Sequence, residues 1–227
     1  MGPAFLSELR RPWLWKGSAV GAALVLGFIS LMVLAAALEA GPPLASLAGP
    51  LTEAGLTLTL TGSAVVGSFA FTADYRNGSF SRRVLLFQRG PAFLGRAATT
   101  VLAALISGAV IGLIFFLVGE LLDEAWQLGL PACPAFAGIA GMGSIWGFAA
   151  GSLIRNHLVS LFAVPLTLLL PEMLLGPDSR FFPILAADWA TQAAVNIPAW
   201  GSFAGATSWL LVVLAVAFVI FLKRDLA

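Results

Sequence analysis

Six stretches of mostly apolar residues, nearly free of charged side chains, dominate this sequence of 227 residues. A helix that crosses a bilayer needs about 20 such residues. The six stretches are 17–37, 55–73, 97–119, 135–154, 158–175 and 205–222. Five contain no Asp, Glu, Lys or Arg, and the exception is Glu172 in the fifth. We therefore predict an all-α integral membrane protein of six transmembrane helices, forming a single domain over 1–227.

The polar composition excludes several functions. Only 10% of the residues are charged, against roughly 25% in a soluble domain, and a net charge of +1 gives no sign of a nucleic-acid partner. The single cysteine, Cys133, and the single histidine, His157, exclude a disulfide framework and most metal chemistry. We expect no metal and no catalytic residue.

Basic residues predict the orientation, because cytoplasmic loops retain Lys and Arg. With the N-terminus inside, the inner segments hold Arg10, Arg11, Lys16, Arg76, Arg82, Arg83, Arg89, Arg96, Arg155, Lys223 and Arg224. Only Arg180 lies outside. Both termini are therefore expected in the cytoplasm.

Two segments outside the spans predict helices at the inner surface. Phe5, Leu9 and Trp13 repeat at helical spacing, which is typical of an amphipathic helix lying on the membrane and broken at Arg11 by Pro12. The second helix is expected at 79–89, after the Asn77-Gly78 turn, capped by Ser79 and stopped by Gly90-Pro91. Its apolar face holds Phe80, Val84 and Phe87, and its basic residues are Arg82, Arg83 and Arg89.

A third segment, 176–202, lies between the fifth and sixth spans. It is too apolar for a solvated loop, and Pro183 and Pro198 interrupt it too often for a span. We expect short re-entrant helices that dip into the outer leaflet and pack against protein.

The sequence contains no motif that could supply energy for transport. It contains no phosphate-binding loop, since neither lysine follows a glycine. No carboxylate lies mid-span to couple transport to an ion or proton. A serine hydrolase would have to pair Ser144 with His157, which lie some 15–20 Å apart along one helix. If the protein moves a solute uphill, the energy enters from another chain.

Small and hydroxyl side chains mark two helix faces. Gly143, Gly147 and Gly151 recur every four residues, which favours close helix packing over a moving seam. Thr57 and Thr61 share a face, with Ser68 seven residues on. These three side chains either line a substrate path or bond back to their own helix.

The segment 71–100 resembles the signature loop of the permeases of type-2 ABC exporters. In this resemblance Asp74 matches an acidic position, Asn77-Gly78-Ser79 a turn, and Arg96 the basic residue before the third span. The residues 83–86 match the apolar part of the loop, and 147–156 is similar to the end of the fourth span in that family.

The resemblance implies a permease that pairs with a second copy, as a homodimer or heterodimer, in the bacterial cytoplasmic membrane. Each copy would bind a separate ABC ATPase subunit, which would hold ATP and Mg²⁺. The helix at 79–89 would be the coupling helix, with Asp74 and Arg76 at its base. The cargo would be an amphiphilic antibiotic, peptide or lipid. The alternatives are a non-transporting assembly or sensory subunit and an intramembrane enzyme.

Overall fold

The computed structural model describes residues 2–38, 48–76, 84–122, 129–176 and 179–223, and these parts of the chain contain helices and turns but no strand. The helices are α1 (Gly2–Leu9), α2 (Pro12–Leu38), α3 (Ala48–Arg76), α5 (Arg89–Leu122), α6 (Ala132–Ile154), α7 (His157–Leu175), α8 (Phe182–Ala194) and α9 (Trp200–Lys223).

Five helices among the described residues are long and apolar enough to cross a membrane: Ala48–Ala73, Arg89–Glu120, Ala132–Ile154, His157–Leu175 and Trp200–Lys223. The first predicted span, 17–37, lies within α2, and the described side chains there form the apolar stretch Trp15–Leu31. Leucine and valine side chains on α7 and α9 are widely exposed, as expected for helices that face lipid. The chain is a multi-pass helical membrane protein.

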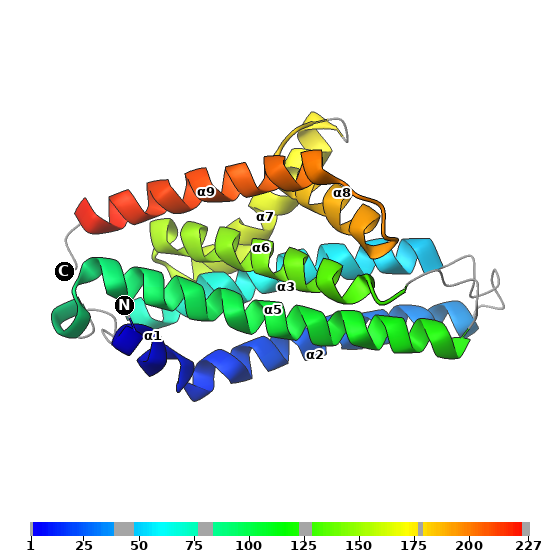
Figure 1. Cartoon of the computed structure of the whole chain (residues 1–227), viewed down its shortest axis with the longest axis horizontal. Coiled ribbons are helices and arrows are strands. Elements are labelled where there is room, and N and C mark those ends of the chain that lie inside the picture. The colour runs from blue at the N-terminus through cyan, green and yellow to red at the C-terminus, as the bar shows by residue number, and fades with distance from the viewer. Residues whose placement is uncertain (1, 39–47, 77–83, 123–128, 177–178, 224–227) are drawn as a thin grey trace.

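The long helices run in alternating directions between two ends of an elongated bundle (Figure 1). The helix α1, the start of α5 and the end of α9 lie together at one end, which we call the α1 end. The helix α8 lies toward the other end, which we call the α8 end. Because of this alternation, the helix α1 and the last turn of α9 lie at the same end of the bundle.

The helix α6 is the centre of the bundle, and it packs most extensively against α3 and α5. Glycines make this contact close: a Cβ on Gly147 would lie 1.8 Å from the carbonyl oxygen of Ala64, and one on Gly143 would lie 2.3 Å from that of Leu60. On the other side, a Cβ on Gly108 of α5 would lie 2.4 Å from the carbonyl oxygen of Phe136. Backbone therefore packs directly on backbone along both faces of α6.

The start of α5 differs from the prediction. We expected Gly90-Pro91 to stop the helix at 79–89, but both residues lie in the first turn of α5. Proline is tolerated there because the first N–H groups of a helix have no intrahelical acceptor. The chain instead breaks at Gln88, whose φ of 67° is left-handed. The prediction placed the stop at the wrong residue.

The predicted break at Arg11 is present, since α1 ends at Leu9 and α2 begins at Pro12. The indole N–H of Trp15 donates to the carbonyl oxygen of Leu9 at 2.9 Å and holds this corner. A second sharp corner joins α6 to α7, where Arg155 takes a left-handed conformation and the Asn156 carboxamide accepts from the amides of Leu158 and Val159.

The segment between the fifth and sixth predicted spans contains α8, with Pro183 in its first turn. The ring of Phe182 stacks on Trp146 of α6 with centroids 4.7 Å apart. Trp189 lies over Gly138 of α6, where a Cβ would meet the indole at 2.2 Å. The helix α8 is thus packed on the central helix.

Candidate functional site

The connection between α3 and α5 holds most of the residues that we assigned to contact with an ATPase. Asp74 and Arg76 lie in the last turn of α3, and only their backbone is described. Asn77, Gly78, Ser79, Phe80, Arg82 and Arg83 lie outside the described residues. The structure resumes with one helical turn at 84–87, which precedes the break at Gln88.

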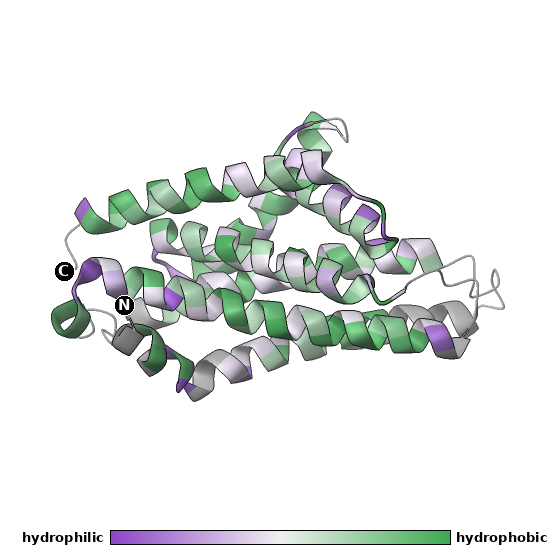
Figure 2. Cartoon of the chain, viewed as in Figure 1, coloured by the Kyte–Doolittle hydropathy of each residue, from purple (hydrophilic) through white to green (hydrophobic). Residues whose placement is uncertain are grey.

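This turn presents two leucines outward. Val84 and Phe87 are half-buried, and Val84 packs against the apolar cluster of the bundle. Leu85 and Leu86, in contrast, are 87% and 76% exposed. Figure 2 shows this hydrophobic turn at the tip of the α1 end. Val84, which we assigned to the partner surface, has neighbours in its own chain. The exposed apolar residues of this turn are Leu85 and Leu86.

A buried ion pair lies at the base of the same connection. Arg96 of α5 is fully buried, and its guanidinium bonds the carboxylate of Glu8 in α1. Its Nε and a terminal nitrogen also donate to the carbonyl oxygen of Ala70 in α3, at 2.9 and 2.8 Å. Arg96 therefore joins α3 and α5, which lie on either side of the connection, to the N-terminal helix α1.

The position of Glu8 changes the account of α1. The sequence predicted a helix lying on the membrane surface, with Phe5 and Leu9 on its apolar face. In the structure Glu8 is only 4% exposed, while Leu6 is 58% exposed. The helix α1 is consequently held on the protein by the Glu8 carboxylate as well as by its packing against α5.

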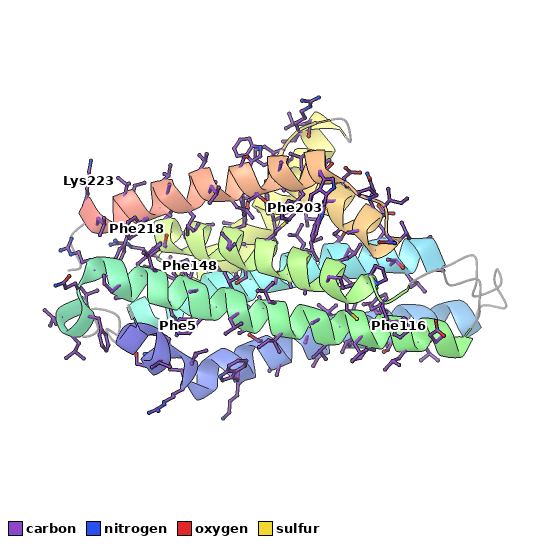
Figure 3. All side chains as sticks on the ribbon, in the orientation of Figure 1. Phe5, Phe116, Phe148, Phe203, Phe218 and Lys223 are labelled. Carbon is purple, nitrogen blue, oxygen red and sulfur yellow. The ribbon has the colours of Figure 1, made fainter. Side chains whose placement is uncertain are left out.

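Phenylalanines pack around this base. Phe71, Phe93, Phe148 and Phe221 are all fully or almost fully buried. The ring centroid of Phe93 lies 5.0 Å from that of Phe148 and 5.0 Å from that of Phe221. Figure 3 shows Phe148 and Phe218 toward the end of the bundle that carries Lys223. The Arg89 guanidinium donates to the carbonyl oxygen of Leu222 at 2.8 Å, which ties the start of α5 to the end of α9.

The three residues assigned to a substrate path lie in different surroundings. Thr57 and Thr61 line a cavity between α3, α7 and α8 with a volume of about 310 Å³. Ser68 is fully buried, donates to the carbonyl oxygen of Val65 at 2.8 Å, and lies against Gly151 of α6. The cavity therefore includes the two threonines, and the serine belongs to the seam between α3 and α6.

The two residues that a hydrolase would require have separate neighbours. The imidazole Nδ1 of His157 lies 3.1 Å from the hydroxyl of Thr72, and its ring stacks on Phe69. Ser144 lies instead at the crossing of α6 and α3, where a Cβ on Gly67 would meet its carbonyl oxygen at 2.4 Å. In the described parts of the chain, no group of three His, Cys, Asp or Glu side chains could hold a metal ion.

Compared with known proteins, the chain matches no family model and no curated sequence. The fold and the residues themselves therefore carry the functional argument. They define a multi-pass helical membrane protein whose α1 end combines an exposed leucine pair with a buried ionic anchor.

Two features of this site were not predicted. The partner of Arg96 was missed because Glu8 lies 88 residues earlier and its helix was read as facing lipid headgroups. A signal was present, since Arg96 is a lone charge beside a long apolar stretch and needs a counter-charge when buried. The outward direction of Leu85 and Leu86 was missed because the apolar face of the predicted helix was assigned to Phe80, Val84 and Phe87.

Proposed function

We propose that this chain is the permease subunit of an ATP-driven exporter, which moves an amphiphilic solute outward across the bacterial cytoplasmic membrane. The observation that carries the proposal is the leucine pair Leu85–Leu86, exposed at the tip of the α1 end. Burying a leucine side chain is worth about 1.5–3 kcal/mol. A partner protein that covers both residues would gain that free energy, and it would then pull on the connection between α3 and α5.

The surroundings of the pair support a role in force transmission. Arg96 ties α3, α5 and α1 together a short distance beyond the break at Gln88. Movement of the turn at 84–87 would therefore be passed to three helices. The resemblance of 71–100 to the permease signature loop identifies the expected partner as an ATPase that binds ATP and Mg²⁺ on its own chain.

The distribution of basic residues supports the orientation. The elements that meet at the α1 end carry Arg10, Arg11, Lys16, Arg89, Arg96, Arg155 and Lys223. Because basic residues are retained on the cytoplasmic side, we infer that this end and both termini face the cytoplasm. We also propose that α2 crosses the membrane as the first of six spans, and that α8 is the re-entrant element at the outer side.

A second copy of the fold is part of the proposal. The space between α2, α3, α5 and α6 measures only about 20 Å³, which is room for a single water molecule, so a path for an amphiphile does not run between these four helices. A continuous path for an amphiphile would be completed between two permease chains, either two copies of this one or this one and a sister. Closed two-fold assemblies are the commonest arrangement for such partners.

The leucine pair provides the test of this function. The tagged chain is purified from its own membrane, and the ratio of copurified ABC ATPase to permease is measured. The double variant Leu85→Asp/Leu86→Asp should lose most of the bound ATPase, because two carboxylates would face an apolar surface. The matched control is Leu130→Asp, since Leu130 is 68% exposed and immediately precedes α6, at the opposite end of the bundle.

The control should keep the ATPase at the ratio of the unchanged protein. If the double variant also keeps it, the leucine pair is not the contact and the coupling assignment is wrong. If the ATPase binds through the pair but proteoliposomes transport nothing, the chain is an assembly or sensory subunit instead.

A further inference from the structure

The cavity between α3, α7 and α8 combines apolar walls with acidic groups. Its volume of about 310 Å³ lies at the lower end of the range for small-molecule sites. Leu168 and Leu169 of α7 and Ile184 of α8 supply apolar wall. Thr57 and Thr61 of α3 supply hydroxyl groups. An occupant with both an apolar body and a polar head would match this lining.

Two carboxylates from different helices line the same cavity. Glu53 belongs to α3 and Asp188 to α8. The carboxylate of Asp188 is held in position, because it accepts from the Gln192 carboxamide at 2.7 Å and from the hydroxyl of Ser202 in α9. Glu53 lies four residues, one helical turn, before Thr57, so this carboxylate and the threonines share the α3 wall of the cavity.

The lining contains no basic residue among the described side chains, so no lysine or arginine in it balances the two acids. A cation in this space would be attracted by both carboxylates. An anionic ligand would meet the opposite field. A bare metal ion would leave the leucine and isoleucine walls without contact, and it would find only two carboxylates.

We propose that this cavity binds a lipophilic organic cation, with its ammonium group between Glu53 and Asp188 and its apolar body against α7 and α8. The proposal rests on the function proposed above, in which the chain moves an amphiphile, and it specifies the charge of that amphiphile. The cavity lies toward the α8 end, opposite to the leucine pair. It is therefore a site on the path of the solute and separate from the contact with the ATPase.

The test measures binding to the purified protein in lipid nanodiscs by calorimetry, with empty nanodiscs as the background. Three probes share one body and differ in the head group: phenylbutylammonium, phenylbutanol and phenylbutyrate. The ammonium should bind most tightly. Glu53→Gln and Asp188→Asn should each weaken it about threefold and together about tenfold, as expected for partly exposed charge pairs. Binding of the alcohol should be unchanged in these variants.

The matched control is Glu120→Gln, which removes an exposed carboxylate from α5 that does not line the cavity. This variant should leave ammonium binding unchanged. Equal weakening by Glu120→Gln, or equal binding of the alcohol and the ammonium, would overturn the proposal, because the effect would then come from overall charge or from the lipid. The assay contains no ATPase, so the cation site and the coupling assignment fail or stand separately.

Discussion

At the scale of single residues, the pair Glu8–Arg96 is the most demanding feature of the molecule. Removing two charges from water costs several kcal/mol each, and only good geometry with additional hydrogen bonds offsets that cost. Arg96 meets these conditions through Glu8 and through two bonds to the carbonyl oxygen of Ala70. Such a pair contributes little net stability, but the loss of one partner leaves a buried charge without its counter-charge. The pair therefore specifies the position of α1 on the bundle.

We predict that Arg96→Met destabilises the protein by about 3 kcal/mol, the lower end of the range for breaking a buried pair, because the buried Glu8 would lose Arg96 and keep its longer contact with Arg11 at 3.9 Å. The double variant Glu8→Met/Arg96→Met should recover most of that loss, since apolar side chains of similar volume replace the pair. Denaturant unfolding in detergent measures both changes. Losses that simply add in the double variant would mean that the two residues do not act as a pair.

At the scale of elements, the sequence predicted which stretches are helical, but it placed the start of α5 at the wrong residue. Each of the six apolar stretches lies inside a helix, because twenty apolar residues in lipid have no other way to satisfy their backbone. The start of α5 was wrong because Gly90-Pro91 was taken as a stop, although proline in a first turn is compatible with a helix. The break at Gln88 depends on a backbone conformation that the residue type does not reveal.

The seam between α3 and α6 provides the prediction at this scale. Gly147→Ala should destabilise the protein by about 1–3 kcal/mol, the range for overpacking, because its Cβ would lie 1.8 Å from the carbonyl oxygen of Ala64. The control is Gly27→Ala in α2, where a Cβ would have nothing within 4 Å. That change should be neutral or stabilising by up to about 1 kcal/mol, from helix propensity alone. Equal effects of the two variants on the unfolding midpoint in detergent would contradict the close approach.

At the scale of the whole molecule, local pattern predicted the class of fold, while long-range pairing determined the site. The contact of α1 with α5 joins residues far apart in sequence, and no local pattern links Glu8 to Arg96. The cavity at Thr57 and Thr61 was anticipated as a hydroxyl-lined face of one helix. Its acidic character was not, because Asp188 reaches it only through the packing of α8 against α3 and α7.

The orientation of the whole chain is testable by labelling single cysteines in intact cells, in a Cys133→Ser background. An impermeant reagent added outside should label Arg180→Cys, which is exposed between α7 and α8. It should not label Asn77→Cys until the membrane is permeabilised, because the connection between α3 and α5 is predicted to face the cytoplasm. Labelling of Asn77→Cys in intact cells would reverse the orientation.

The central claim, that this chain is one half of a membrane path powered by a separate ATPase, is tested most directly by the native mass of the complex extracted from its own membrane. The account predicts two permease chains, of 23.6 kDa each if both are this chain, together with bound ATPase subunits. Loss of the ATPase from that mass in Leu85→Asp/Leu86→Asp would connect the assembly to the exposed turn. A single permease chain with no ATPase in the active complex would contradict the account.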